Sequence, residues 1–285
     1  MLISPEPALN DGFGESVALG PSFAVVGAPG YESGDGGVHD YEKAGDAFRL
    51  RAVVESPERA DTHTEVLGRY GGAVASDGAL LFVGAALESE WRDGRARCEG
   101  GGVVYVFDRA AAARQLVTSL RGTRPNENFG SSVACAGDLL VVGAAADSSS
   151  EALPGAVYVY RRAAADGWSL IGRVEGERAG ERFGARVAID GERFAVSAPG
   201  RADLARPQGG GRVDVFDVSE GGCAKVASTR EAPGFGDALA LRGDRLAIGQ
   251  PMFSLPGRPR RRWPIRGKFR MTQTRWAFPR SSALA

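Results

Sequence analysis

The stretch that decides the fold runs Phe183-Gly184-Ala185-Arg186-Val187-Ala188-Ile189-Asp190-Gly191-Glu192-Arg193-Phe194-Ala195-Val196-Ser197-Ala198-Pro199. Two short apolar runs lie on either side of Asp190-Gly191, and such a pair is a strong hairpin signal because both residues accept positive φ. After a polar loop, Gly211-Arg212-Val213-Asp214-Val215-Phe216 has the alternation of a further strand. The segment therefore predicts a series of antiparallel β-strands.

The same pattern occurs five times along the chain. An aromatic residue followed by Gly stands at Phe13, Tyr70, Phe129, Phe183 and Phe235, with spacings of 57, 59, 54 and 52 residues. Fourteen residues after each aromatic comes a second mark: Gly27-Ala28-Pro29, Gly84-Ala85-Ala86, Gly143-Ala144-Ala145, Ser197-Ala198-Pro199 and Gly249-Gln250-Pro251. A fixed internal offset of this kind indicates a repeat architecture.

Each repeat has room for four short strands. The first two are expected at Ser16–Leu19 and Phe23–Gly27 in repeat 1 and at the matching positions of the others. The third begins at Gly37, Gly102, Gly155 or Gly211, and the fourth fits Phe48–Glu55, Arg114–Leu120, Trp168–Val174 and Cys223–Thr229. Four antiparallel strands per repeat are typical of a propeller blade, whereas the rungs of a β-solenoid are shorter. We therefore predict an all-β fold, a β-propeller of four-stranded antiparallel blades with four full repeats plus a partial fifth, in an incomplete or open ring.

Taken together, the aromatic–Gly pair, the Gly-Ala-Pro mark and runs such as Gly155-Ala156-Val157-Tyr158-Val159-Tyr160 resemble the FG-GAP repeat. This is the blade unit of integrin α-type propellers and of many bacterial surface proteins, and the resemblance covers Asn10 to Pro251. It implies a non-enzymatic binding or adhesion module of a bacterial protein, secreted or at the cell surface, with a protein or glycan ligand at one rim. Family propellers usually have seven blades, so ring closure stays open here. Leu2–Ala8 resembles the last strand of a preceding repeat.

The charge distribution divides the chain into residues 1–256, the propeller, and residues 257–285, a basic tail. No acid follows Asp244, and the tail holds nine bases, so the body carries 26 bases against 35 acids. An acidic body argues against nucleic acid as a partner of the repeats. The tail is expected to be poorly ordered or non-native sequence; the alternative is a basic arm that binds an anionic polymer. The chain has no membrane-length apolar run and no signal peptide at its start, which speaks against export of the chain as written.

No metal or cofactor is expected. Cys98, Cys135 and Cys223 are far apart and fit neither a disulfide framework nor a zinc site. Some FG-GAP blades hold calcium in an Asp-rich loop, but the corresponding hairpins here carry single acids that fit turns: Asp77, Asp138, Asp190 and Asp244. The acidic stretches Glu88–Asp93 and Asp147–Glu151 are interpreted as solvated loops.

The sequence offers little support for catalysis. His39 and His63 are the only histidines, and no nucleophile elbow, metalloprotease motif or phosphate-binding loop occurs. We therefore expect a protein that is not an enzyme. Two alternatives stay open: a propeller hydrolase or lyase with its site at the central channel, and a truncated, non-functional fragment.

Ligand contacts are expected in the loops of one rim, because rigid blades there hold the segments that vary most between repeats. Tyr31 and Trp91 are the aromatic residues of these loops, and exposed aromatics suit binding. We predict them as ligand-contact residues; the alternative is ordinary packing against a neighbouring blade. The ligand itself is not specified by the sequence.

Overall fold

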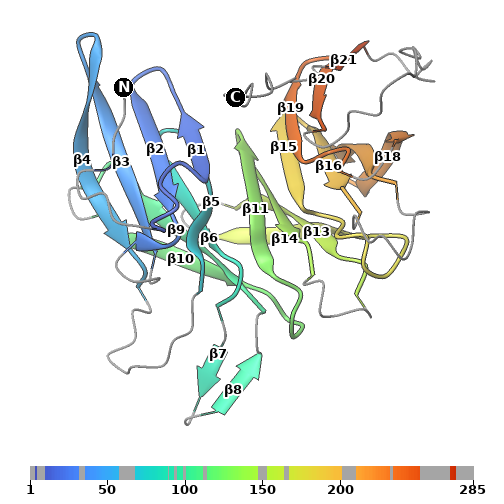
Figure 1. The fold of residues 1–285 in the computed structure, drawn as a ribbon, viewed down its shortest axis with the longest axis horizontal. Helices are drawn as coiled ribbons and strands as arrows, with labels where there is room; N and C mark the ends of the chain where they lie inside the picture. The colour runs from blue at the N-terminus through green and yellow to red at the C-terminus, as the bar shows by residue number, and fades with distance from the viewer. Residues whose placement is uncertain are drawn as a thin grey trace, which may run out of the picture.

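A computed structural model describes Ser4 and residues 10–31, 36–57, 68–88, 90–92, 95–98, 101–111, 114–146, 153–163, 167–200, 210–231, 234–250 and 270–273. These residues form an all-β fold made of successive small sheets (Figure 1). We refer to the sheets as blades 1 to 5. In the described part of the chain, no helix has the length and apolar character needed to cross a bilayer.

Four of the blades are four-stranded and antiparallel, and strand order follows chain order from one edge to the other. Blade 1 consists of β1 (Ser16–Leu19), β2 (Phe23–Ala28), β3 (Gly37–Ala44) and β4 (Ala47–Glu55). Blade 2 consists of β5 (Tyr70–Ser76), β6 (Leu80–Ala85), β9 (Val103–Asp108) and β10 (Leu116–Arg121). A hairpin of β7 (Glu90–Arg92) and β8 (Arg95–Cys98) is inserted between β6 and β9.

The later blades repeat this order. Blade 3 consists of β11 (Phe129–Ala136), β12 (Leu139–Ala144), β13 (Ala156–Arg162) and β14 (Trp168–Glu175). Blade 4 consists of β15 (Arg186–Asp190), β16 (Arg193–Ala198), β17 (Arg212–Ser219) and β18 (Gly222–Arg230). Blade 5 has β19 (Ala238–Arg242) and β20 (Arg245–Gly249), with β21 (Arg270–Gln273) parallel to β20.

The predicted blade architecture is confirmed, and most strands match their expected ranges to within one to three residues. The inserted hairpin and the parallel strand β21 were not predicted. Leu2–Ala8, apart from Ser4, and most of residues 257–285 lie outside the described residues. The predicted character of the tail therefore stays a prediction, although its residues 270–273 form β21.

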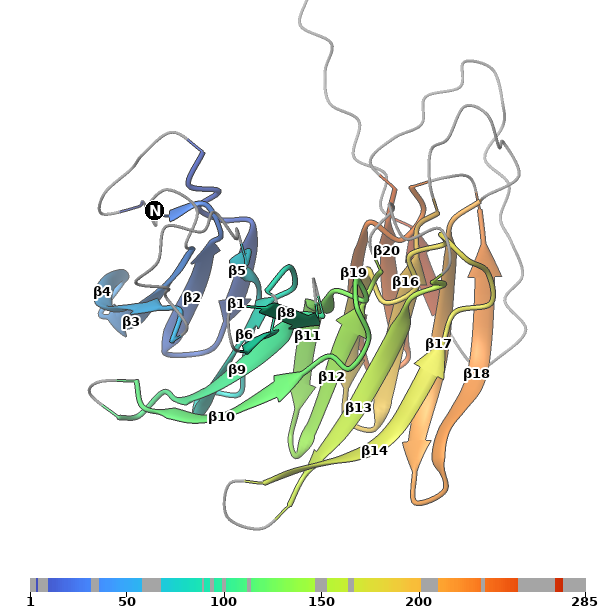
Figure 2. The same ribbon diagram turned by 90° about the horizontal axis from the view of Figure 1, so that it is seen from below.

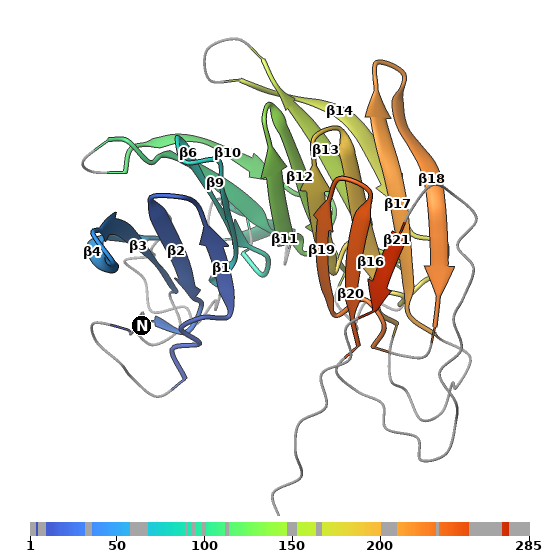
Figure 3. The same ribbon diagram turned by 90° about the horizontal axis from the view of Figure 1, so that it is seen from above.

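The first strand of each blade lies innermost, and successive innermost strands contact one another in the order β1, β5, β11, β15, β19. Figures 2 and 3 show the blades fanned side by side, with the outer strands β4, β10, β14 and β18 away from this centre. β1 and β19, at the two ends of the row, make no comparable contact. The ring is therefore open, as the count of repeats led us to expect.

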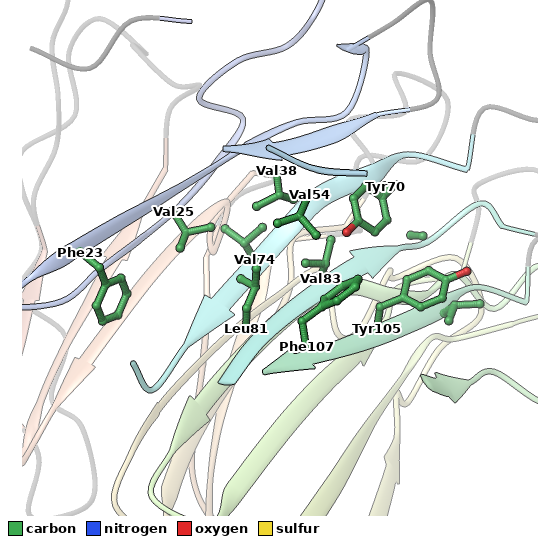
Figure 4. Packing of buried hydrophobic residues seen from close by; sticks show 12 residues of the cluster. Phe23, Val25, Val38, Val54, Tyr70, Val74, Leu81, Val83, Tyr105 and Phe107 are labelled. Atoms are coloured by element: carbon green, nitrogen blue, oxygen red, sulfur yellow. The ribbon is translucent and has the colours of Figure 1, made fainter. Parts of the chain in front are cut away.

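Apolar side chains from facing blades interdigitate, which explains why the second strands have no polar face. Every residue of β2, β6 and β12 is buried. Between blades 1 and 2, Val25 and Val38 pack against Val74, Leu81 and Val83, with Tyr70 in the same cluster (Figure 4). Burial of apolar surface on both sides of each sheet is the main stabilising term of such a stack.

The glycines of the two sequence marks form the closest contact between blades. A Cβ added to Gly27, Gly84 or Gly143 would stand 2.0–2.1 Å from the carbonyl oxygen of Gly71, Gly130 or Gly184, the glycine of the next aromatic–Gly pair. Only glycine allows the backbones to approach so closely. This contact is a physical reason for the fixed offset of the two marks.

The aromatic member of the pair is buried in repeats 2 to 5, whereas Phe13 of repeat 1 is half-buried against its own blade. Phe129 lies in the cluster shared by blades 2 and 3, and Phe183 in the one shared by blades 3 and 4. Each ring also meets the third strand of its own blade: Phe129 is edge-on to Tyr158 at 5.1 Å between centroids. The aromatic wedge thus fixes both the strand order within a blade and the spacing between blades.

The interface between blades 1 and 2 also contains buried charge. The Asp40 carboxylate accepts hydrogen bonds from Arg109 Nε and Nη2 at 3.1 and 2.8 Å, and Arg114 Nη2 lies 2.7 Å from its other oxygen. In the aligned registers of blades 2, 3 and 4, valines stand where blade 1 has Asp40. At this register position the interface between blades 1 and 2 holds an ion cluster instead of a valine. Blade 4 has a separate buried cluster, in which Arg212 pairs with Glu181 at 2.7 Å and lies 3.4 Å from Asp214.

Candidate functional site

The turn that carries each aromatic–Gly pair has the same geometry in all five repeats. The carbonyl of the residue before the aromatic accepts a hydrogen bond from the amide three residues later, and the glycine has positive φ, as a type II turn requires. The accepting residues are Gly12, Arg69, Asn128, Arg182 and Gly234. We call this position the pre-aromatic slot.

Every pre-aromatic slot also has a left-handed backbone, with φ of 65°, 54°, 56°, 58° and 82° in chain order. Glycine adopts this conformation freely and asparagine tolerates it, so repeats 1, 3 and 5 are unstrained here. Arginine has no such tolerance, and positive φ at a long side chain is uncommon. Repeats 2 and 4 therefore hold Arg69 and Arg182 at a conformational cost.

A hollow of about 670 Å³ lies between the innermost strands of blades 1 to 4, and the pre-aromatic slots of repeats 2, 3 and 4 open onto it. Arg69, Asn128 and Arg182 line it together with Glu15 and Arg186. We call these five residues the collar. Below them, each of the four blades contributes one valine to the wall: Val17, Val74, Val133 and Val187.

The collar lies at the rim where sequence analysis placed the ligand. The first residues of β1 and β5 pair with the last residues of β2 and β6, Ser16 with Gly27 and Tyr70 with Ala85. The loops that follow β2 and β6 therefore leave at the same end as the pre-aromatic slots. Leu87, which follows β6, and Ala146, which follows β12 of blade 3, also line the hollow.

The collar is positively charged, because it contains three guanidinium groups and one carboxylate. Arg69 forms an ion pair with Glu15 across the boundary of blades 1 and 2, and both side chains are substantially exposed. Arg186 Nε donates to the carbonyl of Asp237 in blade 5 at 3.1 Å. Burial raises the pKa of Asp237, and the nearby charges of Arg186 and Arg182 partly offset this increase. The collar thus pairs part of its charge with neighbouring repeats and keeps a net positive balance.

Of the two predicted contact residues, only Tyr31 has a described side chain, and it is not part of the hollow lining. Tyr31 is 8% exposed, and its ring meets that of His39 edge-on at 5.2 Å between centroids. This contact lies within blade 1, so packing in its own blade accounts for Tyr31. Trp91 lies in β7 of the inserted hairpin, whose side chains are outside the described residues. A ligand role for either residue stays a prediction.

Three of the four single acids of the first hairpins have structural partners. Asp77 accepts hydrogen bonds from the amides of Ala79 and Leu80 at 2.9 and 2.7 Å, and Asp190 accepts one from Gly243 at 2.6 Å. Asp138 pairs with Arg161 at 2.8 Å. Across the ranges that the structure describes, no three His, Cys, Asp or Glu residues gather as a metal site would require. Asp93 and Asp147–Glu151 lie outside those ranges.

Glu88 has a different role from the solvated loop position expected for it. Its carboxylate accepts a hydrogen bond from the Tyr105 hydroxyl, and burial raises the pKa of Glu88 to about 7. In blade 3, Tyr158 donates to Glu127 at 2.7 Å from the same strand position. Glu127 stands just before its pre-aromatic slot, whereas blade 2 has Gly68 there and supplies the acid from the following loop. The expectation for Glu88 was wrong because the missing acid leaves a buried tyrosine hydroxyl to satisfy.

Sequence reasoning missed the collar arginines. For two of them the signal was present, since Arg69 and Arg182 each directly precede an aromatic–Gly pair where repeats 1 and 5 have glycine. Recognising it required the left-handed geometry of the slot, which the residue types alone do not reveal.

Comparison with known proteins identifies one repeat directly: residues 122–160 match the model of the FG-GAP repeat. No curated protein matches the chain. Among solved structures, a protein from Lactobacillus plantarum is 16% identical, with a TM-score of 0.47, over 77% of this chain and 56% of its own. A chain of the mitotic checkpoint complex is 14% identical, with a TM-score of 0.45, over 79% of this chain and 54% of its own. The chain spans about half the length of these two structures. The family match at residues 122–160 confirms the resemblance noted from the sequence, and the chain carries an FG-GAP repeat within a propeller-like array of blades.

Proposed function

We propose that this chain is a non-enzymatic binding module whose ligand enters the hollow between the innermost strands of blades 1 to 4. The observation that carries the proposal is the hollow itself, of about 670 Å³, with equivalent positions of four successive repeats in its wall. Ligand sites are typically concave and combine an apolar wall with a few polar groups. Its valine layer and charged collar have this composition.

The blades suit such a role because they hold the wall rigidly. The hydroxyls of Ser16 and Ser132 donate to the carbonyls of Gly71 and Gly184 in the next blade, both at 2.7 Å. Because these hydrogen bonds already hold the wall in place, little conformational entropy is lost when a ligand binds. The FG-GAP resemblance supports a place outside the cell or at its surface, with a protein or glycan ligand.

The enzymatic alternative needs acids, histidines or nucleophiles that converge on the hollow. Its described lining offers arginines, valines and small residues, and its carboxylate, Glu15, is paired with Arg69. The hydroxyls of the lining serines Ser16, Ser131 and Ser132 donate to backbone carbonyls. General acid–base chemistry requires a group free to exchange a proton with the substrate. This lining is better suited to holding a ligand than to transforming one.

A blocking variant tests the proposal. Val17 lines the hollow and is 58% exposed, so Val17→Trp should fill the space without disturbing the blades. Leu170→Trp, on the outer strand β14, is the matched control, because Leu170 is 52% exposed. Both variants and the parent chain would be applied to arrays of extracellular-matrix proteins and glycans, beside generic hydrolase substrates.

The proposal predicts binding that Val17→Trp abolishes and Leu170→Trp retains, without turnover of any substrate. Turnover that Val17→Trp abolishes would contradict it in favour of the enzymatic alternative. Binding that survives in Val17→Trp would place the ligand elsewhere on the molecule.

A further inference from the structure

We propose that the collar recognises an acidic peptide segment, with Arg69 and Arg182 as the residues that select its carboxylates. This inference rests on the proposed function and specifies the ligand class of the same hollow. It combines three observations: the backbone conformation of the two arginines, the charge of the collar and the chemistry of the wall beneath it.

The first observation is that the two arginines occupy positions that disfavour them. All five pre-aromatic slots are left-handed, and two of them hold glycine. Glycine would serve the turn in repeats 2 and 4 as well, without strain. Bulky residues kept in sparsely populated backbone regions concentrate at functional sites, where the surrounding structure imposes the conformation. The turn does not need these side chains, so a ligand is the reason we infer for them.

The second observation concerns placement and charge. Both arginines line the same hollow, from blades 2 and 4, with Asn128 of blade 3 in the slot between them. Arg186 adds a third guanidinium, and Glu15 is the opposing carboxylate of the collar. The planar fork of arginine binds carboxylates in a bidentate manner, and such charge-assisted hydrogen bonds are stronger than neutral ones. The collar therefore favours an oxyanion over a neutral or cationic ligand.

The third observation distinguishes a peptide from a sulfated glycan. Below the collar the wall consists of valines and small residues such as Ala73 and Ala145. A sulfated sugar would leave these apolar groups without complementary contacts, whereas a peptide can place an apolar side chain there. The ligand that satisfies both layers is a segment with an acidic residue next to an apolar one.

The test uses fluorescent pentapeptides of sequence Val-Xaa-Val-Zaa-Val, in which both variable positions are Asp or Glu, or their amides Asn or Gln. Fluorescence anisotropy would measure binding to the full chain, with a heparin decasaccharide as competitor. We expect the acidic peptides to bind at least about tenfold more tightly than their amide counterparts. The decasaccharide should compete less effectively than an unlabelled acidic peptide.

The deciding variant is the double change Arg69→Gly with Arg182→Gly. Glycine adopts positive φ without strain, so both turns should be retained. The melting temperature should therefore fall by no more than the loss of the exposed Arg69–Glu15 ion pair explains. The preference for acidic peptides should drop to about threefold or less. Asn126→Gly makes the same kind of change at an exposed, left-handed asparagine outside the collar, and Arg49→Gln with Arg162→Gln removes two exposed charges elsewhere. Both controls should keep the preference.

Three results would overturn the inference: equal binding of acidic and amide peptides, a preference that survives the double variant, or displacement of every peptide by the decasaccharide at lower concentration. If ligands still enter the hollow and Val17→Trp still blocks them, only the ligand class is wrong. If nothing that binds is sensitive to Val17→Trp, the proposed function fails as well.

Discussion

The blade interfaces and the collar are built from the same repeats, but the interface contact is nearly the same in each repeat whereas the residue type in the collar changes. At the interfaces of blades 1 to 4, a glycine of one repeat meets the glycine carbonyl of the next at nearly the same short distance each time. In the collar, the five equivalent slots hold Gly, Arg, Asn, Arg and Gly on nearly the same backbone. The repeat thus keeps its spacing constant while the chemistry at its inner rim changes.

This difference separates what the fold requires from what the fold tolerates. A side chain at the interface glycine would collide with backbone, which cannot move without separating the blades. A side chain at the pre-aromatic slot extends into the hollow and costs only local backbone strain. Function can therefore diverge at the collar without loss of the blade stack.

The largest expected effect comes from breaking an interface. Gly143→Ala should lower the free energy of unfolding by about 3 kcal/mol or more, because its Cβ would lie 2.0 Å from the Gly184 carbonyl oxygen. Gly249→Ala is the matched control at the same position in blade 5, where the nearest atom is a side-chain carbon of Ala238 at 3.0 Å. Urea denaturation of both variants measures the difference. Equal losses would refute a special role for the backbone contact.

The next effect concerns the charged interface between blades 1 and 2. Asp40→Asn leaves Arg109 and Arg114 buried without their counter-charge and should cost about 3–5 kcal/mol. Asp217→Asn, which breaks the more exposed pair with Arg193, should cost less than about 1 kcal/mol. Thermal denaturation followed by circular dichroism compares the two variants. A loss of stability in Asp40→Asn as small as that in Asp217→Asn would show that the cluster is already hydrated.

A pH dependence should follow from Glu88. Its folded pKa of about 7 exceeds the ordinary value of 4.5, so the folded state binds the proton more tightly than the unfolded state does. Its contribution to stability is therefore complete below about pH 4.5 and is lost as pH rises through about 7. The loss should reach about 3 kcal/mol at most.

Glu88→Gln should remove this part of the pH dependence, since an amide can still accept the Tyr105 hydroxyl hydrogen bond without titrating. Glu42→Gln, at an exposed position, controls for the loss of one charge. Urea denaturation midpoints of the three proteins between pH 4.5 and 8 supply the comparison. An unchanged slope in Glu88→Gln would assign the dependence to another group.

The smallest effect should have the opposite sign. Arg182→Gly relieves a left-handed arginine at φ 58° and should raise stability by about 0.5 kcal/mol, after the entropic cost of glycine in the unfolded chain. Arg186→Gly, in strand β15 beside it, should lower stability by about 0.5–1 kcal/mol. Differential scanning calorimetry can distinguish the expected increase in stability of Arg182→Gly from the expected decrease of Arg186→Gly. Destabilisation by Arg182→Gly would mean that this side chain supports the fold.

The blade architecture could be predicted because it is written in local patterns that recur. The apolar run Leu139–Gly143 and the Asp190-Gly191 turn each specify structure within a few residues, and the fixed offset extends that information to every repeat. The aromatic–Gly pair was found in the same way, and its rings Phe129 and Phe183 are buried between blades.

The collar could not be predicted in this way, because it depends on how four repeats converge in space. Arg69 and Arg182 are 113 residues apart in the sequence and share a hollow only after the blades have stacked. The buried acid Glu88 was hidden for a related reason: it substitutes for an acid that Gly68 does not provide. The sequence pattern of a single repeat does not show that a residue from another repeat or another segment shares its site or supplies a missing group.

The most direct test of the account is nuclear magnetic resonance mapping of the arginine Nε–Hε groups while an acidic Val-Glu-Val-Asp-Val peptide is added. If the collar is the binding site, the signals of Arg69, Arg182 and Arg186 should shift together and saturate at one peptide per chain, while those of Arg161 in β13 and Arg193 in β16 stay unchanged. Shifts confined to arginines outside the collar, or spread evenly over the molecule, would contradict it.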